Sequence, residues 1–362
     1  MTRLLLLGAG HAQLAVLAAL ARRRIPGAEV VLVSPNERFI YSGMVPGLIA
    51  GRFDENECST DVASLAAAGG VSFLRGRAAA IDAEARCVTL ADGQRIEYDV
   101  LSLDTGGTQD RDRLPGARDN ALFLRPMEGF VELWQRTLAL ATERELDVVV
   151  IGNGAAGVEI ALALRRALAA RCSVSLVSDG ELLPAHGPAV RRRALDALQF
   201  NGVQLLPGRC TAIEPWHVRL GALRVACDVP ILAVGSDAPS WLAGSALALD
   251  AQGFVRIGAT LQSASHPNVF AAGDVIVRDD HPHPRSGVYA VRAGPVLAAN
   301  LRRFIVGAPL KPYRPQRRSL YLISLADGRA IASWAGWSVQ GRAIGRWKDR
   351  IDRAFIARYS KK

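Results

Sequence analysis

The sequence predicts an α/β protein in which one arrangement of strand, glycine turn, helix and strand occurs twice. The first copy begins with an apolar strand at Leu4–Leu7, and the turn Gly8-Ala9-Gly10 follows it directly. A helical pattern continues through Ala21, and a second strand is expected at Val30–Val33. A glycine turn at this point lets the backbone approach the phosphates of a dinucleotide, and the helix N-terminus adds free N–H groups and partial positive charge.

The second copy is the more regular of the two. Its strand at Val148–Ile151 leads into Gly152-Asn153-Gly154-Ala155-Ala156-Gly157, which opens a helix to about Ala170 and a strand at Val174–Val177. Three glycines at this spacing, with a strand before them and a helix after them, form the dinucleotide-binding motif of Rossmann folds. Gly8 and Gly152 are 144 residues apart, so the chain is an internal duplication of this unit.

The first copy departs from the full motif at two positions. Gln13 stands where a third glycine normally packs the helix against the strand. Its side chain is therefore expected to tilt the helix or to point out of that contact. The second strand ends at Val33-Ser34 rather than at the acid that commonly binds a ribose. Ser34 can still form a weaker hydrogen bond there, and Glu37 is the alternative partner.

Beyond the two turns, the chain continues in short strands separated by turns. A hairpin is predicted from Cys87–Leu90 through Asp92-Gly93 to about Ile96. Further apolar segments are Tyr98–Gly107, Ile231–Gly235 and Asn268–Asp274, and a helix is expected from about Gly287 to Phe304.

Composition places the chain among globular proteins. Half of its residues are hydrophobic, yet no stretch reaches the ~18 apolar residues of a membrane span. Leu4–Leu7 is too short for a secretory signal, so a cytoplasmic protein is expected. The cysteines form no C-x-x-C pair and are expected to be scattered, mostly buried thiols; they are Cys58, Cys87, Cys172, Cys210 and Cys227.

Positive charge is concentrated at the C-terminal end, where residues 301–362 carry 15 Lys and Arg against 3 Asp. Within residues 341–362 an apolar stripe recurs at helical spacing, formed by Ile344, Trp347, Ile351, Phe355 and Tyr359. Such a basic amphipathic helix either lies on an anionic membrane surface or packs its stripe on the protein's own core. Lys348 and Arg358 fall within the stripe and would have to snorkel. No nucleic-acid-binding module is recognised, so nucleic acid is not an expected partner.

The paired glycine turns, Tyr98–Gly107 and Phe270–Asp274 together resemble the pyridine nucleotide-disulfide oxidoreductase superfamily. The order of motifs looks closest to the branch that holds type II NADH dehydrogenases and sulfide:quinone reductases. Within that branch, four segments look like a subfamily that occurs fused to selenophosphate synthetase: Gly8–Gln13, Gly287–Arg292, Tyr313–Arg318 and Trp347–Asp349.

The resemblance implies two Rossmann-like domains, with a discontinuous FAD domain into which an NAD(P) domain is inserted. The FAD domain would comprise residues 1–110 and 241–308, and the NAD(P) domain residues 111–240. Residues 309–362 would form a short C-terminal region with the basic helix. The implied cofactors are FAD and NAD(P)H.

For FAD, the resemblance implies that Gly8 and Gly10 meet the diphosphate and that Thr105-Gly106 passes near the flavin, although Asp104 stands where that motif commonly has alanine. Asp274 would bind the ribityl or phosphate region, with Gly273 allowing the approach. Tyr41-Ser42-Gly43-Met44-Val45-Pro46 would line the isoalloxazine ring, and the helix after Gly287 would stabilise the reduced flavin by its dipole. Further cofactor contacts are expected from His11, Ala12, Ser34, Gly235 and Tyr289; His11 fits a helix cap equally well.

For the nicotinamide nucleotide, Gly152, Gly154 and Gly157 would hold the phosphates, and Glu159 would be the catalytic group at the nicotinamide end. Asp179 follows the second strand of this unit, where an acid binds a ribose 2′-hydroxyl and repels a 2′-phosphate. NADH is therefore favoured over NADPH. Arg191-Arg192-Arg193 is the opposing signal, although arginine runs on helices commonly face solvent.

The expected activity is hydride transfer from NADH to FAD, followed by electron transfer to a second acceptor such as a quinone. No metal is required, and Asp279–His283 is interpreted as a solvated loop. The absence of a cysteine near the first helix or after Cys227 argues against disulfide and sulfide chemistry. Relatives that reduce quinones favour a membrane contact for the C-terminal helix, on the inner face of the membrane. The alternative is an accessory flavin-binding protein of a selenium pathway, with little turnover.

Overall fold

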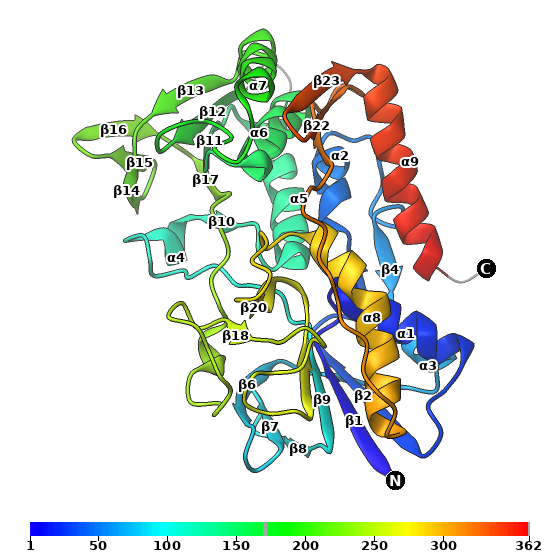
Figure 1. The fold of residues 1–362 in the computed structure, drawn as a ribbon. Coiled ribbons are helices and arrows are strands. Elements are labelled where there is room, and N and C mark those ends of the chain that lie inside the picture. The colour runs from blue at the N-terminus through cyan, green and yellow to red at the C-terminus, as the bar shows by residue number, and fades with distance from the viewer. Residues whose placement is uncertain (169–171, 361–362) are drawn as a thin grey trace.

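Two five-stranded parallel sheets form the centre of the molecule (Figure 1). The computed structural model describes residues 1–168 and 172–360. In the first sheet the strand order is β19 (Val269–Ala271), β9 (Val100–Leu103), β1 (Thr2–Leu7), β2 (Ala28–Ser34) and β5 (Ser72–Arg75). In the second sheet the order is β10 (Leu122–Phe123), β17 (Val229–Leu232), β11 (Asp147–Ile151), β12 (Ser173–Ser178) and β13 (Gln204–Pro207). The predicted α/β fold with two Rossmann-like units is confirmed.

The first sheet is discontinuous in sequence. Its edge strand β19 comes from the chain that follows the whole second sheet, and it pairs in parallel with β9. Figure 1 shows the first sheet at the bottom in blue and cyan and the second at the upper left in green. The NAD(P)-type unit is thus inserted into the FAD-type unit, as the sequence predicts.

The centre of the first sheet is β1, in which Leu4–Leu7 are all buried. Both faces of a central parallel strand are covered, which is why this strand reads as an unbroken apolar run. Helices α1 (His11–Arg22) and α8 (Gly287–Ile305) pack against each other beside the sheet. They approach closely at Gly294, where an added Cβ would lie 2.7 Å from the Cβ of Ala15.

Gln13 does not point out of the contact between helix and sheet, so this alternative of the expectation is wrong. The side chain is fully buried, and its Nε2 donates to the carbonyl oxygen of Ser102 at 3.0 Å. The Ser102 hydroxyl in turn donates to Gln13 Oε1 at 3.1 Å. A polar pair therefore replaces the glycine contact, because each buried polar atom of the amide finds a partner on β9.

Smaller elements flank the two sheets. The antiparallel strands β6 (Ala78–Asp82), β7 (Cys87–Leu90) and β8 (Arg95–Glu97) form the predicted hairpin region. A second antiparallel sheet consists of β14 (Cys210–Glu214), β15 (His217–Leu220) and β16 (Leu223–Ala226), and a third consists of β3 (Arg38–Ile40) and β4 (Ser59–Asp61). A short parallel pair is β18 (Val255–Arg256) with β20 (Ile276–Val277). The remaining helices before the C-terminal region are α2 (Val45–Ile49), α3 (Val62–Ala68), α4 (Ala117–Asn120), α5 (Met127–Glu143), α6 (Ala155–Ala167) and α7 (Pro188–Phe200). Helix α6 ends at Ala167, and Ala170, where the sequence predicts its end, lies outside the described residues.

The C-terminal region consists of the antiparallel strands β21 (Tyr321–Ser324), β22 (Ala330–Trp334) and β23 (Trp337–Gly341), followed by helix α9 (Arg342–Tyr359). Figure 1 shows α9 in red along the right side of the molecule. Across residues 1–168 and 172–360, no helix has the length and apolar character needed to span a bilayer. Lys361 and Lys362, part of the predicted basic segment, lie outside the described residues.

The apolar stripe of α9 is divided between the protein and the surface. Phe355 and Tyr359 are buried, whereas Trp347 and Ile351 are 45% and 40% exposed. Lys348 does not snorkel, and that expectation is wrong. Its Nζ is buried against the protein, 2.7 Å from Asp352 Oδ2 and 2.6 Å from the carbonyl oxygen of Gly43.

Candidate active site

A cavity of about 1300 Å³ opens along the carboxyl ends of the strands of the first sheet. This is the edge at which parallel α/β sheets commonly bind ligands. The cavity is lined by nine of the predicted cofactor residues, which come from five separate stretches of chain: Gly8, Gly10, His11, Ser34, Ser42, Thr105, Gly106, Gly273 and Asp274. Residues 236–241, which follow the second sheet, also line the cavity.

The first glycine turn lies directly against the end of β9. Gly8 has a φ of +90°, and a Cβ there would lie 2.5 Å from the carbonyl oxygen of Asp104. The Gly10 amide donates to that same oxygen at 3.0 Å. A side chain at either glycine would collide with the backbone or the carboxylate of Asp104, which explains why this turn needs glycine.

Asp104 is buried beneath the turn, with 2% of its surface exposed. Its Oδ2 accepts the backbone amides of Ala12 and Gln13 at 2.7 and 2.8 Å. Burial raises the pKa of this carboxyl to about 7; the two amides oppose the shift, and the charge of Asp274 adds to it. The N-terminal amides of α1 are therefore held by the protein's own carboxyl group. Ala12 contributes to this arrangement without lining the cavity.

Two polar atoms in the cavity wall fit a polar ligand. Among the described residues, His11 Nε2 and Thr105 Oγ1 are buried and have no hydrogen-bond partner in the protein. Burial lowers the pKa of His11 to about 4, with Arg125 adding to the shift and Asp274 opposing it. A neutral histidine, a threonine hydroxyl and a glycine cradle suit the ribityl chain and diphosphate of a flavin dinucleotide, because buried polar atoms need partners.

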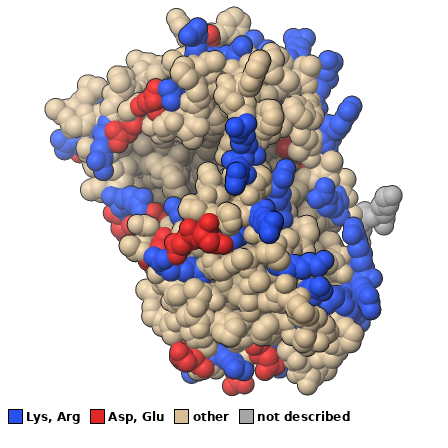
Figure 2. Space-filling model, viewed as in Figure 1, with Lys and Arg blue, Asp and Glu red and all other residues tan. Residues whose placement is uncertain are grey.

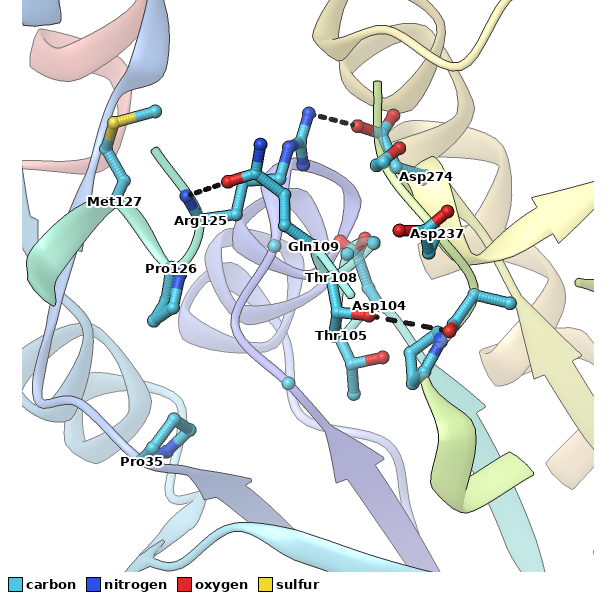
Figure 3. A pocket seen from close by; sticks show the side chains of 18 of the residues that line it. Pro35, Asp104, Thr105, Thr108, Gln109, Arg125, Pro126, Met127, Asp237 and Asp274 are labelled. Carbon is cyan, nitrogen blue, oxygen red and sulfur yellow. Dashed lines mark hydrogen bonds and ion pairs between the residues drawn. The ribbon is translucent and has the colours of Figure 1, made fainter. Parts of the chain in front are cut away.

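Arg125 is a further candidate binding residue, which no pattern in the sequence indicates. Its Nη2 lies 2.9 Å from Asp274 Oδ2, and both side chains line the cavity (Figure 3). Gln109 positions it, because Gln109 Oε1 accepts the Arg125 backbone amide at 3.0 Å. Arg125 and Gln109 lie in irregular segments without periodicity, so no local pattern marks them. Only the fold brings them to Asp274.

Several predicted residues lie away from the cavity wall: Tyr41, Pro46, Gly235 and Tyr289. Tyr41 stacks on Phe355 of α9, with ring centroids 4.4 Å apart. Tyr289 is buried and stacks on His283 at 4.5 Å. Ser42, from the stretch expected beside the flavin, does line the cavity, and Phe39 and Ile40 just before it line the cavity as well.

The two residues expected to bind a ribose take different positions. The Ser34 hydroxyl is within the cavity wall and donates to the carbonyl oxygen of Asn36 at 3.0 Å. Glu37 lies outside the wall, and its carbonyl oxygen accepts the amide of Val62, which begins α3.

The second glycine turn is built as its motif requires. Gly152 has a φ of +144°, and a Cβ at Gly157 would collide with the Gly152 carbonyl oxygen. Gly154 has open space where its Cβ would be, at the N-terminus of α6. Asn153 closes the next turn by donating from Nδ2 to the carbonyl oxygens of Asp179 and Glu181 at 2.9 and 3.0 Å.

Asp179 is exposed at the end of β12 and lies 3.9 Å from the guanidinium of Arg209. The three neighbouring arginines of α7 do not act as one cluster. Arg191 pairs with Glu181, Arg193 donates to the Ser338 hydroxyl, and Arg192 is exposed. The Asp179 carboxylate is thus accessible to a ribose, whereas the Arg191 guanidinium is already paired with Glu181.

Glu159 lies on α6, facing the C-terminal region. Its Oε1 accepts the Ser324 amide at 2.7 Å. Burial raises the pKa of Glu159 to about 7; Lys348 and the Ser324 amide oppose the shift, and Asp352 adds to it. Asp352 also hydrogen-bonds Tyr41 and, with burial, raises the pKa of that phenol. Tyr41, which precedes α2, and Lys348 and Asp352, both on α9, thus lie around Glu159. Glu159 itself does not line the cavity.

The cysteines, all within the described part of the chain, are buried free thiols. Across residues 1–168 and 172–360, no group of three or more His, Cys, Asp or Glu side chains is placed to hold a metal ion. His283, from the loop considered as a metal site, stacks on Tyr289 instead.

The chain is similar to quinone reductases over most of its length. It is 27% identical over 330 residues to demethylphylloquinone reductase of Synechocystis sp., covering 87% of this chain and 81% of that protein. It is 27% identical over 333 residues to an alternative NAD(P)H-ubiquinone oxidoreductase of Arabidopsis thaliana, covering 80% and 64%. The solved structure of NDH2 from Plasmodium falciparum in complex with NADH has the same fold, with a TM-score of 0.82 at 13% identity over 99% of this chain and 97% of that one.

These likenesses agree with the two Rossmann-like units. The family model for pyridine nucleotide-disulphide oxidoreductases matches residues 2–294, which is most of the chain. The chain therefore belongs to the pyridine nucleotide-disulphide oxidoreductase family.

Proposed function

We propose that this protein is an FAD-dependent NAD(P)H dehydrogenase that reduces a quinone. The observation that carries the proposal is the cavity along the first sheet, with the glycine cradle, Asp274 and Arg125 in its wall, next to a second unit with a complete dinucleotide turn. The curated relatives named above are quinone reductases, which supports a quinone as the acceptor. FAD supplies, when bound, the capacity to accept a hydride and to pass electrons to a second acceptor.

In this proposal Gly8, Gly10 and His11 contact the diphosphate of FAD, and Thr105-Gly106 borders the flavin. Asp274 accepts hydrogen bonds from the ribityl chain, and Arg125 provides the positive charge beside it. The N-terminus of α8, at Gly287, also borders the cavity. Its dipole places partial positive charge where electron density accumulates in a reduced flavin. Ser34 binds the adenosine end of FAD. The FAD domain in this proposal comprises residues 1–110 and 241–308.

The nicotinamide nucleotide binds the inserted unit, residues 111–240, with its phosphates at Gly152, Gly154 and Gly157 and its ribose at Asp179. An exposed carboxylate at the end of β12 accepts a 2′-hydroxyl and repels a 2′-phosphate, so NADH is the preferred donor. Gly235 follows β17, the neighbour of β11 in the same sheet, and is proposed to contact the same cofactor. Glu159 acts as an acid–base group on the nicotinamide side, because a pKa near 7 allows both protonation states at neutral pH.

The protein is proposed to work on the inner face of a membrane, where quinones are dissolved. Arg342, Arg346 and Arg350 are exposed on α9, the helix that carries the outward-facing Trp347 and Ile351. Figure 2 shows Lys and Arg side chains along the right edge of the molecule, over α9 and the end of α1. Trp334 and Trp337 of the preceding hairpin are 52% and 80% exposed and suit the same interface. The likeness of four segments to the subfamily fused to selenophosphate synthetase supports a further link, in which that enzyme is a physical partner.

Anaerobic stopped-flow spectroscopy of the flavin-loaded protein tests the function. NADH is expected to bleach the flavin absorbance within seconds, and a water-soluble quinone is expected to restore it. NADPH should reduce the flavin more slowly and at higher concentration. Failure to bind FAD, or a flavin that neither nucleotide reduces, contradicts the proposal. Faster reduction by NADPH contradicts the assignment of Asp179 alone, and a flavin that reoxidises only with other acceptors contradicts the quinone.

A further inference from the structure

The carboxyl group of Asp104 lies in the part of the FAD cradle where a diphosphate is expected. Gly10 and Gly273 make room for it: a Cβ on Gly10 would lie 2.5 Å from Asp104 Oδ1, and a Cβ on Gly273 would collide with the same oxygen. Asp104 also belongs to the cavity wall. In this chain both glycines therefore accommodate a carboxyl group of the protein as well as a ligand.

Asp104 also occupies two backbone N–H donors that would otherwise be free to bind an incoming anion. Its Oδ2 accepts the Ala12 and Gln13 amides, which are at the N-terminus of α1. A helix N-terminus stabilises one negative charge close to it, but the diphosphate of FAD brings two more. Mutual repulsion between a buried carboxylate and a diphosphate is strong because water does not screen it.

The charged groups around Asp104 do not neutralise it. From the 273–275 turn, Asp274 adds a second carboxylate, which favours the protonated form of Asp104. Arg125 forms its ion pair with Asp274 rather than with Asp104. His11, on α1, is neutral because burial lowers its pKa. Binding a proton is the remaining way to remove the charge of Asp104.

We propose that Asp104 takes up a proton when FAD binds, and that the neutral carboxyl group is a donor to the diphosphate. Oδ2 continues to accept the two amides of α1, and the proton on Oδ1 points to the ligand side. The proton comes from the solvent buffer, and no other bond changes. This inference rests on the proposed position of FAD at Gly8–Gly10. Asp104 is thus a cofactor-binding residue that makes the affinity for FAD depend on pH.

The direction of the pH dependence follows from proton linkage. Below the pKa of about 7 that Asp104 has without ligand, the carboxyl is already protonated and FAD binding takes up no proton. Above it, each FAD binds together with one proton, so the affinity falls up to tenfold for each pH unit. The fall ends at the higher pKa that Asp104 has in the complex.

Isothermal titration of the apoprotein with FAD, in buffers of different ionisation enthalpy, measures this proton directly. At pH 8 the wild type is expected to take up close to one proton. Asp104→Asn mimics the protonated carboxyl, since its amide oxygen accepts the two N–H groups and its NH₂ donates. It should take up none, show an affinity that is independent of pH, and bind FAD about tenfold or more tightly than the wild type at pH 9.

Glu97→Gln removes one exposed carboxylate from β8 and serves as the matched control, with proton uptake expected to equal that of the wild type. Zero uptake by the wild type, or equal uptake by wild type and Asp104→Asn, overturns the inference. Asp274→Ala separates this result from the proposed function. If Asp274→Ala still weakens FAD binding, only the role of Asp104 is wrong; if it has no effect, FAD lies elsewhere.

Discussion

Asp274 and Arg125 form an ion pair in the wall of the large cavity, although they are 149 residues apart in sequence. The Asp274 side chain is 10% exposed and that of Arg125 is 37% exposed, so the pair is open to the cavity on the arginine side. Such a pair is partly desolvated, and removal of one partner leaves the other without its main contact.

Replacement of Asp274 by alanine is expected to weaken FAD binding at least tenfold, because the ribityl chain loses an acceptor and Arg125 loses its orientation. Flavin fluorescence during titration of the apoprotein measures this. Asp279→Ala is the control, since Asp279 pairs with Arg256 in an exposed loop, and it should retain wild-type affinity. Equal affinities of the two variants would show that the ion pair has no part in FAD binding.

For individual residues, the sequence predicts those positions that depend on the spacing of residues close together in the chain. Gly8 and Gly157 could be assigned to tight turns from their positions in the sequence between a strand and a helix, because such a turn restricts the backbone of only a few neighbouring residues. Arg125 and the carboxyl contacts of Asp104 could not, since their partners come from distant segments. The stacking of Tyr41 on Phe355 could not be predicted either, since this contact depends on how α9 packs.

Helix α9 shows the limit of periodicity at the scale of an element. The spacing of its apolar residues predicts the helix, yet it does not say which part of the stripe faces the protein. Lys348 was assigned to the surface because it is charged, whereas Asp352 and the Gly43 carbonyl give it buried partners. Helix α5 was not predicted, although Phe130, Val131 and Trp134 are buried at helical spacing and could have indicated it.

The double substitution Trp347→Gln and Ile351→Gln is expected to reduce binding to anionic vesicles at least tenfold. Each exposed apolar side chain contributes ~1.5–3 kcal/mol when it is fully buried, and Trp347 and Ile351 are partly exposed on α9. Cosedimentation with vesicles at low salt measures the loss. Truncation before α9 is the weaker experiment, since it also removes the buried Phe355, Tyr359 and Lys348.

Leu223→Gln is the matched control for this experiment, because Leu223 is 57% exposed on β16, in a different part of the chain. Its vesicle binding should equal that of the wild type. The membrane contact is contradicted if the wild type stays in the supernatant, or if the double variant binds vesicles as well as the control does.

The cysteines are distributed over the whole molecule, and all of them are buried free thiols. Burial raises the pKa of Cys58 and of Cys227 to about 12, so both thiols are protonated at neutral pH. Each single Cys→Ala variant is expected to keep NADH-driven flavin reduction within about twofold, since hydride transfer needs alignment rather than a thiol. Stopped-flow reduction of flavin-loaded variants measures this. A variant that keeps its FAD and fold but loses the reduction would assign a role to that cysteine.

The discontinuous first sheet has a consequence for how the chain is made. Strand β9 ends at Leu103, while its outer neighbour β19 begins at Val269. During synthesis from the N-terminus, the unpaired edge of β9 leaves the ribosome long before its partner, and the entire second sheet is translated in between. An exposed edge strand is open to pairing with other chains. The exposed edge of β9 is covered only when residues 269–271 have been made and pair with it.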